Sequence, residues 1–171
     1  MISILRATED DSESIAAIGM ISVEEAHRGS CSAEALNMYL SENYNQNAIQ
    51  KELSDSDNIY HIITYQDKLA GFSKIILNAE HDNIPQKNVT KLDRIYLLKE
   101  FQGLKLGLSL LNFNIELARQ HDQSGIWLFT WVGNTNAINF YLKAGFKIIG
   151  SHYFKVTDEV FNLNHHMLLD L

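Results

Sequence analysis

Apolar and polar positions alternate with two different periods along the chain, and each period predicts a kind of element. Residues Ile2–Arg6 alternate at the spacing of a short strand. Apolar residues then recur at helical spacing over three stretches, which predict helices at residues 10–26, 32–44 and Gln46–Leu53. We expect these helices to cover one side of the protein.

Two apolar-rich segments after the helices predict an antiparallel hairpin. They cover Ile59–Tyr65 and residues 70–77, and the polar residues 66–68 separate them. A polar stretch over residues 78–88 holds the only proline of the chain and is expected to be a loop. This loop leads into a third strand over residues 92–98.

The C-terminal half begins with an amphipathic segment and ends in strands. Residues 106–119 are predicted to form a helix, because they carry one apolar stripe. The nearly all-apolar segment 126–132 predicts a central strand. A further helix is expected at Thr135–Lys143, followed by strands near residues 147–156 and 165–169.

The order of these elements indicates the fold class. One strand and three helices precede a hairpin, a strand–helix–strand unit, another helix and two final strands. Elements in this order pack as a sheet with helices against it. We predict an α/β fold with a single mixed, mostly antiparallel, twisted sheet and helices on both faces.

Composition agrees with one packed domain over residues 1–171, since 46% of the residues are hydrophobic and 20% are charged. No apolar run approaches the roughly 18 residues of a membrane span. The first residues also lack the pattern of a secretion signal. Cys31 is the only cysteine, so no internal disulfide can form. We therefore expect a cytoplasmic protein that does not contact a membrane.

Net charge narrows the choice of partners. The formal charge of −7 argues against a nucleic-acid ligand, which calls for a clustered basic face. The same charge attracts a small cation, although solubility alone also accounts for an acidic surface.

The turn between the third strand and the amphipathic helix has the composition of a phosphate-binding loop. Helix N-termini present unpaired amides that bind anions. Gly103 and Gly107 remove side chains that would block a close ligand, and Lys105 adds a cation. Simple turn glycines are the alternative interpretation.

A second segment makes the interpretation of this turn more specific. Residues 132–146 resemble a signature of the GNAT acetyltransferases, Asn-x-x-Ala-x-x-Phe-Tyr-x-x-x-Gly-Phe, and every specified position matches. The turn is similar to the acetyl-CoA loop of that family, Arg/Gln-x-x-Gly-x-Gly/Ala, through Gln102 and Gly107. It departs from the loop at Lys105, which stands where the first glycine is usual. We expect a helical backbone there, which would accept a lysine.

The resemblance implies acetyl-CoA as co-substrate, bound between the third strand and the two motifs. One backbone N–H of residues 97–99 would also stabilise the oxyanion of the reaction, and the amide of Asn134 would hold the pantetheine arm. The residues implied in cofactor binding are Leu97, Leu98, Lys99, Gln102, Gly103, Lys105, Leu106, Gly107, Leu108, Ser109, Leu110, Asn134, Ala137 and Tyr141.

Tyr141 corresponds to the usual general acid of the family, because a phenol is protonated at neutral pH and can donate to a thiolate. Packing in the core is its alternative role. Asp93 is the candidate catalytic base, expected on the strand face that carries Ile95 and Leu97. Ion pairing of Asp93 with Arg94 or Lys91 is the alternative. Glu25 and His27, or a chain of waters, are the other candidate bases.

The acceptor is expected to be a small primary amine such as a polyamine. Residues 99–102 and 151–154 look like the bacterial polyamine-acetyltransferase branch. A peptide acceptor, a non-catalytic acyl-CoA-binding module and a homodimer remain open. No metal is expected, because His165 and His166 are adjacent on a predicted strand and point to opposite faces.

Overall fold

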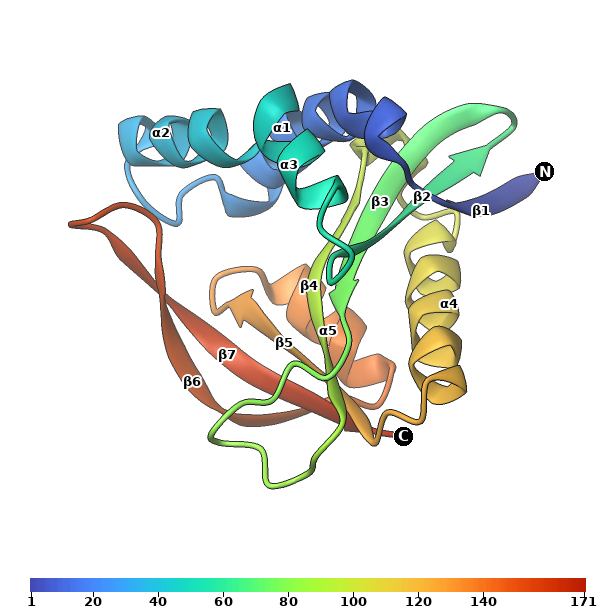
Figure 1. Cartoon of the computed structure of the whole chain (residues 1–171). Coiled ribbons are helices and arrows are strands. Elements are labelled where there is room, and N and C mark those ends of the chain that lie inside the picture. The colour runs from blue at the N-terminus through green and yellow to red at the C-terminus, as the bar shows by residue number, and fades with distance from the viewer.

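The computed structural model describes residues 1–171 and joins seven strands in one sheet (Figure 1). Neighbouring strands follow the order β1-β2-β3-β4-β5-β7-β6, and every pair is antiparallel except β4–β5. The predicted mixed, mostly antiparallel sheet is confirmed. The strands are β1 Ile2–Arg6, β2 Ile59–Tyr65, β3 Lys68–Ile76, β4 Val89–Leu97, β5 Gly125–Trp131, β6 Lys147–Lys155 and β7 Phe161–Asp170.

Five helices cover the two faces of the sheet, as predicted. In Figure 1, α1–α3 lie together at the top of the molecule, and α4 lies beside the sheet at the right. The helices are α1 Ser12–His27, α2 Ala33–Asn43, α3 Gln46–Leu53, α4 Leu106–Gln120 and α5 Thr135–Lys143. None of them has the length and apolar character that a bilayer crossing requires.

Side chains alternate between the two faces of the sheet along each strand, and they pack into a separate hydrophobic core on each face. Tyr60 and Phe72 are fully buried beneath α1–α3. Ile75 and Ile126 pack on the opposite face, against Leu111 of α4. Burial of one such large side chain contributes about 1.5–3 kcal/mol. The sheet is therefore held from both sides, which fixes the positions of its strand ends.

Expected boundaries were wrong at the start of β4, which begins at Val89 instead of residue 92, at the β2–β3 hairpin and at the start of β7. The hairpin between β2 and β3 turns on Gln66 and Asp67 alone, both at positive φ, and such a two-residue turn matches the twist of the strands. Strand β7 begins at Phe161 instead of residue 165, paired with Lys155 of β6. The polar residues Asn162 and Asn164 are buried on this strand, which hid its start from a hydrophobicity pattern.

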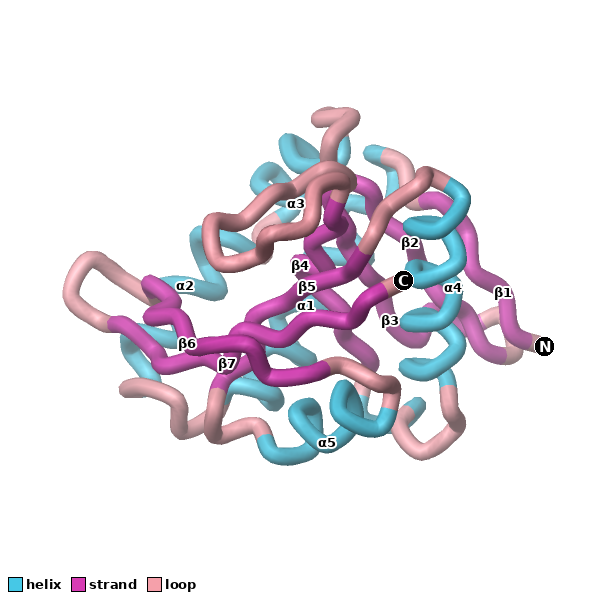
Figure 2. Tube along the Cα trace, turned by 90° about the horizontal axis from the view of Figure 1, so that it is seen from below, coloured by secondary structure: helices cyan, strands magenta, loops and turns pink.

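The β6–β7 ribbon extends past the rest of the sheet toward α2 (Figures 1 and 2). An edge-on aromatic contact joins the two, since the rings of Tyr39 in α2 and Phe154 in β6 lie 5.8 Å apart. This contact places α2 beside the β6–β7 ribbon.

Candidate active site

Strands β4 and β5 part in the middle of the sheet (Figure 1). They are paired at only three positions, from Val89 opposite Gly125 to Lys91 opposite Trp127. Beyond Lys91, β4 remains paired with β3 but has no strand on its other side. Its backbone groups on that side are left for a ligand, because unpaired N–H and C=O groups need a hydrogen-bond partner.

A β-bulge changes the direction of side chains on β4. Lys74 of β3 lies opposite Arg94, and the next residue, Ile75, lies opposite Leu92, so Asp93 has no partner. An extra residue of this kind shifts the alternation of side chains along the strand. The prediction that Asp93 shares a face with Ile95 and Leu97 was therefore wrong.

The backbone of residues 97–99 is only partly free. The N–H of Leu98 donates to the carbonyl of Ala70 at 2.9 Å, and the carbonyls of Leu98 and Lys99 accept from the following turn. The expectation that the Leu98 N–H serves a ligand was wrong. Alternation along the strand turns the N–H of Leu97 toward the gap, which makes Leu97 the better donor.

The N-terminus of α4 presents amides without partners in the helix. Its first helical hydrogen bond joins the N–H of Ser109 to the carbonyl of Lys105, so the N–H groups of residues 106–108 precede the ladder. Helices α2, α3 and α5 each begin with a capping side chain, whereas α1 and α4 have none. Helix α1 continues from a short helical turn at Glu9–Asp11. At the N-terminus of α4 an anion can supply the cap.

Lys105 adopts a left-handed backbone with φ 61° and ψ 11°. The expected helical conformation at this position was wrong. A side chain costs roughly 1–2 kcal/mol in this region, which glycine avoids. The usual glycine of the loop thus has a physical reason, and Lys105 is under local strain. Gly103 also has positive φ, and open space surrounds it.

The other predicted loop residues divide into buried and accessible ones. Leu106 and Leu110 are fully buried, so only their backbone can reach a ligand. The Ser109 hydroxyl donates to the Lys105 carbonyl. Leu108 is exposed, as is Gln102.

The turn at residues 102–107 and the segment at residues 132–146 come together at Gly107. A methyl group on Gly107 would lie 3.4 Å from the Leu97 side chain and 3.9 Å from the ring of Phe140 in α5. Asn134 caps α5, because its Oδ1 accepts the N–H of Ala137 at 3.1 Å. The end of β4 and the first turns of α4 and α5 therefore surround the gap.

Tyr141 lies on α5 and is buried against Phe146 and the core of that face. Burial raises its pKa, so the phenol is fully protonated at neutral pH. Burial also raises the pKa of Tyr96 on β4, and Tyr39 and Tyr141 raise it further. The Tyr141 hydroxyl is thus within electrostatic range of Tyr96.

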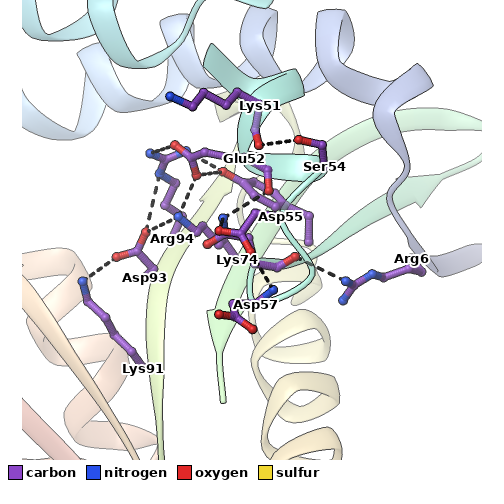
Figure 3. A network of polar contacts seen from close by, with 12 residues as sticks. Arg6, Lys51, Glu52, Ser54, Asp55, Asp57, Lys74, Lys91, Asp93 and Arg94 are labelled. Atoms are coloured by element: carbon purple, nitrogen blue, oxygen red, sulfur yellow. Dashed lines mark hydrogen bonds and ion pairs between the residues drawn. The ribbon is translucent and has the colours of Figure 1, made fainter. Parts of the chain in front are cut away.

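Asp93 belongs to an ion-pair network beneath α3 (Figure 3). Its carboxylate lies 2.7 Å from Lys91 Nζ and 3.1 Å from Lys74 Nζ. Burial alone would raise its pKa, but Lys91, Lys74 and Arg94 hold the pKa at about 2. A carboxylate with so low a pKa is a weak proton acceptor. The structure therefore favours the ion-pair interpretation of Asp93 over the role of base.

Glu52 at the end of α3 completes the network, and the sequence did not indicate it. Its carboxylate binds Lys74 at 2.6 Å and Arg94 at 2.9 Å, and it accepts the Tyr60 hydroxyl at 2.7 Å. The available signal was the presence of Lys74 and Arg94 within strands that are otherwise largely apolar. Buried cations on strands require carboxylate partners.

The histidines do not form a metal centre. His166 is fully buried and His165 is half-buried. No group of three or more histidine, cysteine, aspartate or glutamate side chains is arranged to hold an ion.

Comparison with known proteins agrees with this arrangement. Residues 31–146 match the model of the acetyltransferase (GNAT) family. An uncharacterized N-acetyltransferase of Lactobacillus delbrueckii subsp. lactis is 26% identical over 158 residues, which are 92% of this chain and 91% of that protein. A probable spermine N(1)-acetyltransferase of Bacillus subtilis subsp. natto is 32% identical over half of this chain and 57% of its own length.

The fold is also that of a solved acetyltransferase. The PaiA N-acetyltransferase of Thermoplasma acidophilum, solved in complex with coenzyme A, superposes with a TM-score of 0.80. The two are 21% identical, and the match covers 100% of this chain and 99% of the other. The chain belongs to the GNAT family. It is accordingly an N-acetyltransferase that uses acetyl-CoA.

Proposed function

We propose that the protein transfers the acetyl group of acetyl-CoA to a small primary amine in the gap between β4 and β5. The parting of these strands after Lys91 carries the proposal. It leaves one edge of β4 unpaired beside the uncapped amides of α4 and the buried phenol of Tyr141. Backbone donors, an anion site and a proton donor are the groups that acetyl transfer requires.

In this proposal the amine nitrogen attacks the thioester carbonyl carbon, and the carbon–sulfur bond then breaks. The Leu97 N–H donates to the oxygen that becomes negative during the attack. Tyr141 gives its proton to the departing sulfur, and the nitrogen loses one proton. The first amides of α4, with Gln102, Gly103 and Lys105, hold the phosphates. Asn134 and Ala137 border the pantetheine arm.

The charge of the protein and the aromatic residues near the gap favour a cationic amine as the acceptor. The net charge of −7 attracts cations. Two aromatic contacts support an acceptor site near the gap: the rings of Tyr39 in α2 and Phe154 in β6 lie 5.8 Å apart, and those of His27 and Trp131 lie 6.3 Å apart. Aromatic faces bind ammonium groups. The partial likeness to a probable spermine acetyltransferase supports a polyamine in particular. A cytoplasmic location and a single domain stay predictions from the sequence.

A turnover screen tests the proposal. Acetyl-CoA is offered with polyamines, amino acids, aminoglycosides and basic peptides, without added metal, and release of free thiol is measured. We expect turnover with polyamines. CoA at 100 times its dissociation constant should stabilise the fold by about 2.7 kcal/mol. Turnover with peptides alone would overturn the small-amine acceptor, and the lack of any CoA-induced thermal shift would overturn the site.

Lys105 allows the loop to be tested by two opposite substitutions. Lys105→Gly should raise the free energy of unfolding by up to about 1 kcal/mol, because it removes the strain of the left-handed backbone. CoA affinity should change little. Lys105→Glu keeps that strain and should weaken CoA binding about tenfold, because it places an anion beside the phosphates. Calorimetric titration with CoA checks both, and equal affinity of the wild type and Lys105→Glu would remove Lys105 from the site.

A further inference from the structure

His27 is the last residue of α1, one of the helices α1–α3 that cover the same face of the sheet. Its Nε2 lies 3.4 Å from the hydroxyl of Tyr96, on the part of β4 that has no pairing with β5. Its ring centroid lies 6.3 Å from that of Trp131, the last residue of β5. One imidazole thus contacts both strands where they have parted.

We propose that His27 is the general base that takes the proton from the acceptor amine, and that Tyr96 positions its ring. The proposal rests on the proposed acetyl transfer and adds the group that this reaction still lacks. The contact with Tyr96 occupies Nε2. In the tautomer that this role requires, Nε2 carries the proton and donates it to the phenol oxygen, and the lone pair of Nδ1 accepts the proton of the substrate.

The proton balance of the step is simple. Attack of the neutral amine on the thioester carbonyl leaves a positively charged nitrogen, which is far more acidic than the free ammonium ion. That nitrogen passes its proton to Nδ1 of His27. The carbon–sulfur bond then breaks, Tyr141 protonates the sulfur, and solvent returns both side chains to their starting states.

The other carboxylate and imidazole candidates fit this task less well. The carboxylate of Asp93 is paired with Lys91 and Lys74, and its low pKa makes it a weak acceptor for the proton of the amine. Glu25 is exposed on α1. His61 and His166 are buried in other parts of the sheet. Only His27 combines partial exposure with contacts to both parted strands.

The surroundings of His27 keep its imidazole neutral. Burial lowers its pKa below the ordinary value of 6.5. The titratable group that contacts it from β4 is Tyr96, and β5 contributes the uncharged Trp131. On its own helix, Glu24 is paired with Arg28 at 2.6 Å. A neutral imidazole at physiological pH can accept a proton, and this ability is lost as the pH falls through its pKa.

The experiment compares wild type, His27→Gln, Tyr96→Phe and the control His121→Gln, which removes an exposed histidine at the far end of α4. We expect kcat of His27→Gln to fall about 100-fold at saturating amine, with unchanged CoA affinity. The kcat of Tyr96→Phe should fall about tenfold, and it should fall further when His27 is also replaced. The control should match wild type. Wild-type kcat should decline below about pH 6.5, and His27→Gln should lack this decline.

Chemical rescue separates catalysis from structure. Added imidazole should restore part of the activity of His27→Ala, because it can occupy the vacated space and accept the proton. A kcat of His27→Gln within threefold of wild type would overturn the proposal. So would a loss that imidazole does not restore, or a pH profile of kcat that is the same for wild type and His27→Gln. Failure of the proposed function is distinct, since it appears as absent turnover of wild type with every amine.

Discussion

Tyr141→Phe should reduce kcat by about 100-fold to 10,000-fold while the protein keeps its fold. The phenylalanine ring retains the packing against Phe146 and the core of α5, so the free energy of unfolding should hardly change. The phenol proton is lost, and with it the donor for the departing thiolate. Because that hydrogen bond strengthens only as the thiolate forms, the loss should fall on kcat and leave the Michaelis constant for acetyl-CoA unchanged.

Tyr44→Phe is the matched control, since it removes the hydroxyl of another buried tyrosine, one in the core beneath α1–α3. Its kcat should equal that of wild type in steady-state assays with the amine found in the screen. Full activity of Tyr141→Phe, together with unfolding of Tyr141→Ala, would assign Tyr141 to packing. Solvent would then supply the proton.

Glu52→Ala should lower the free energy of unfolding by about 3–5 kcal/mol. The substitution removes the carboxylate that binds both Lys74 and Arg94, whose side chains are only 8% and 9% exposed. Asp93 alone cannot neutralise both cations, because Lys91 also binds it. Unpaired buried charges are costly. Urea denaturation followed by tryptophan fluorescence measures the change.

Glu80→Ala provides the comparison for Glu52→Ala. Glu80 forms an ion pair with Lys87 at the same 2.6 Å, but the two side chains are 51% and 74% exposed. Its loss should cost less than about 1 kcal/mol. Equal costs for the two substitutions would show that the network beneath α3 adds no more than a surface ion pair.

Much of the fold could be predicted from local pattern. The bounds of β1, β2, α3 and α5 were expected as they are found, because apolar period and polar breaks coincide at their ends. The predicted helices on both faces follow from the order of elements. The same local signals placed Tyr141 on α5 and Asn134 directly before this helix, which borders the gap.

Two of the errors concern features that depend on pairing across the sheet. Asp93 changed face because of a bulge, which arises only when β3 and β4 align. The occupied N–H of Leu98 follows from the same register. The left-handed Lys105 and the contact of His27 with Tyr96 are tertiary outcomes that no local period encodes. The sequence therefore indicated which segments border the gap, but it did not indicate which of their backbone and side-chain groups are free.

The parting of β4 and β5 also gives the sheet two additional edges in its interior. Open edges invite strands of other molecules, and proteins usually blunt them. Here the three paired positions from Val89 to Lys91 close one end of the opening, and His27 lies between the strands' free ends. A foreign strand that paired with β4 there would have to displace His27 from its contacts with Tyr96 and Trp131. The unpaired backbone at the centre of the protein is therefore a less accessible template for aggregation than an open outer edge.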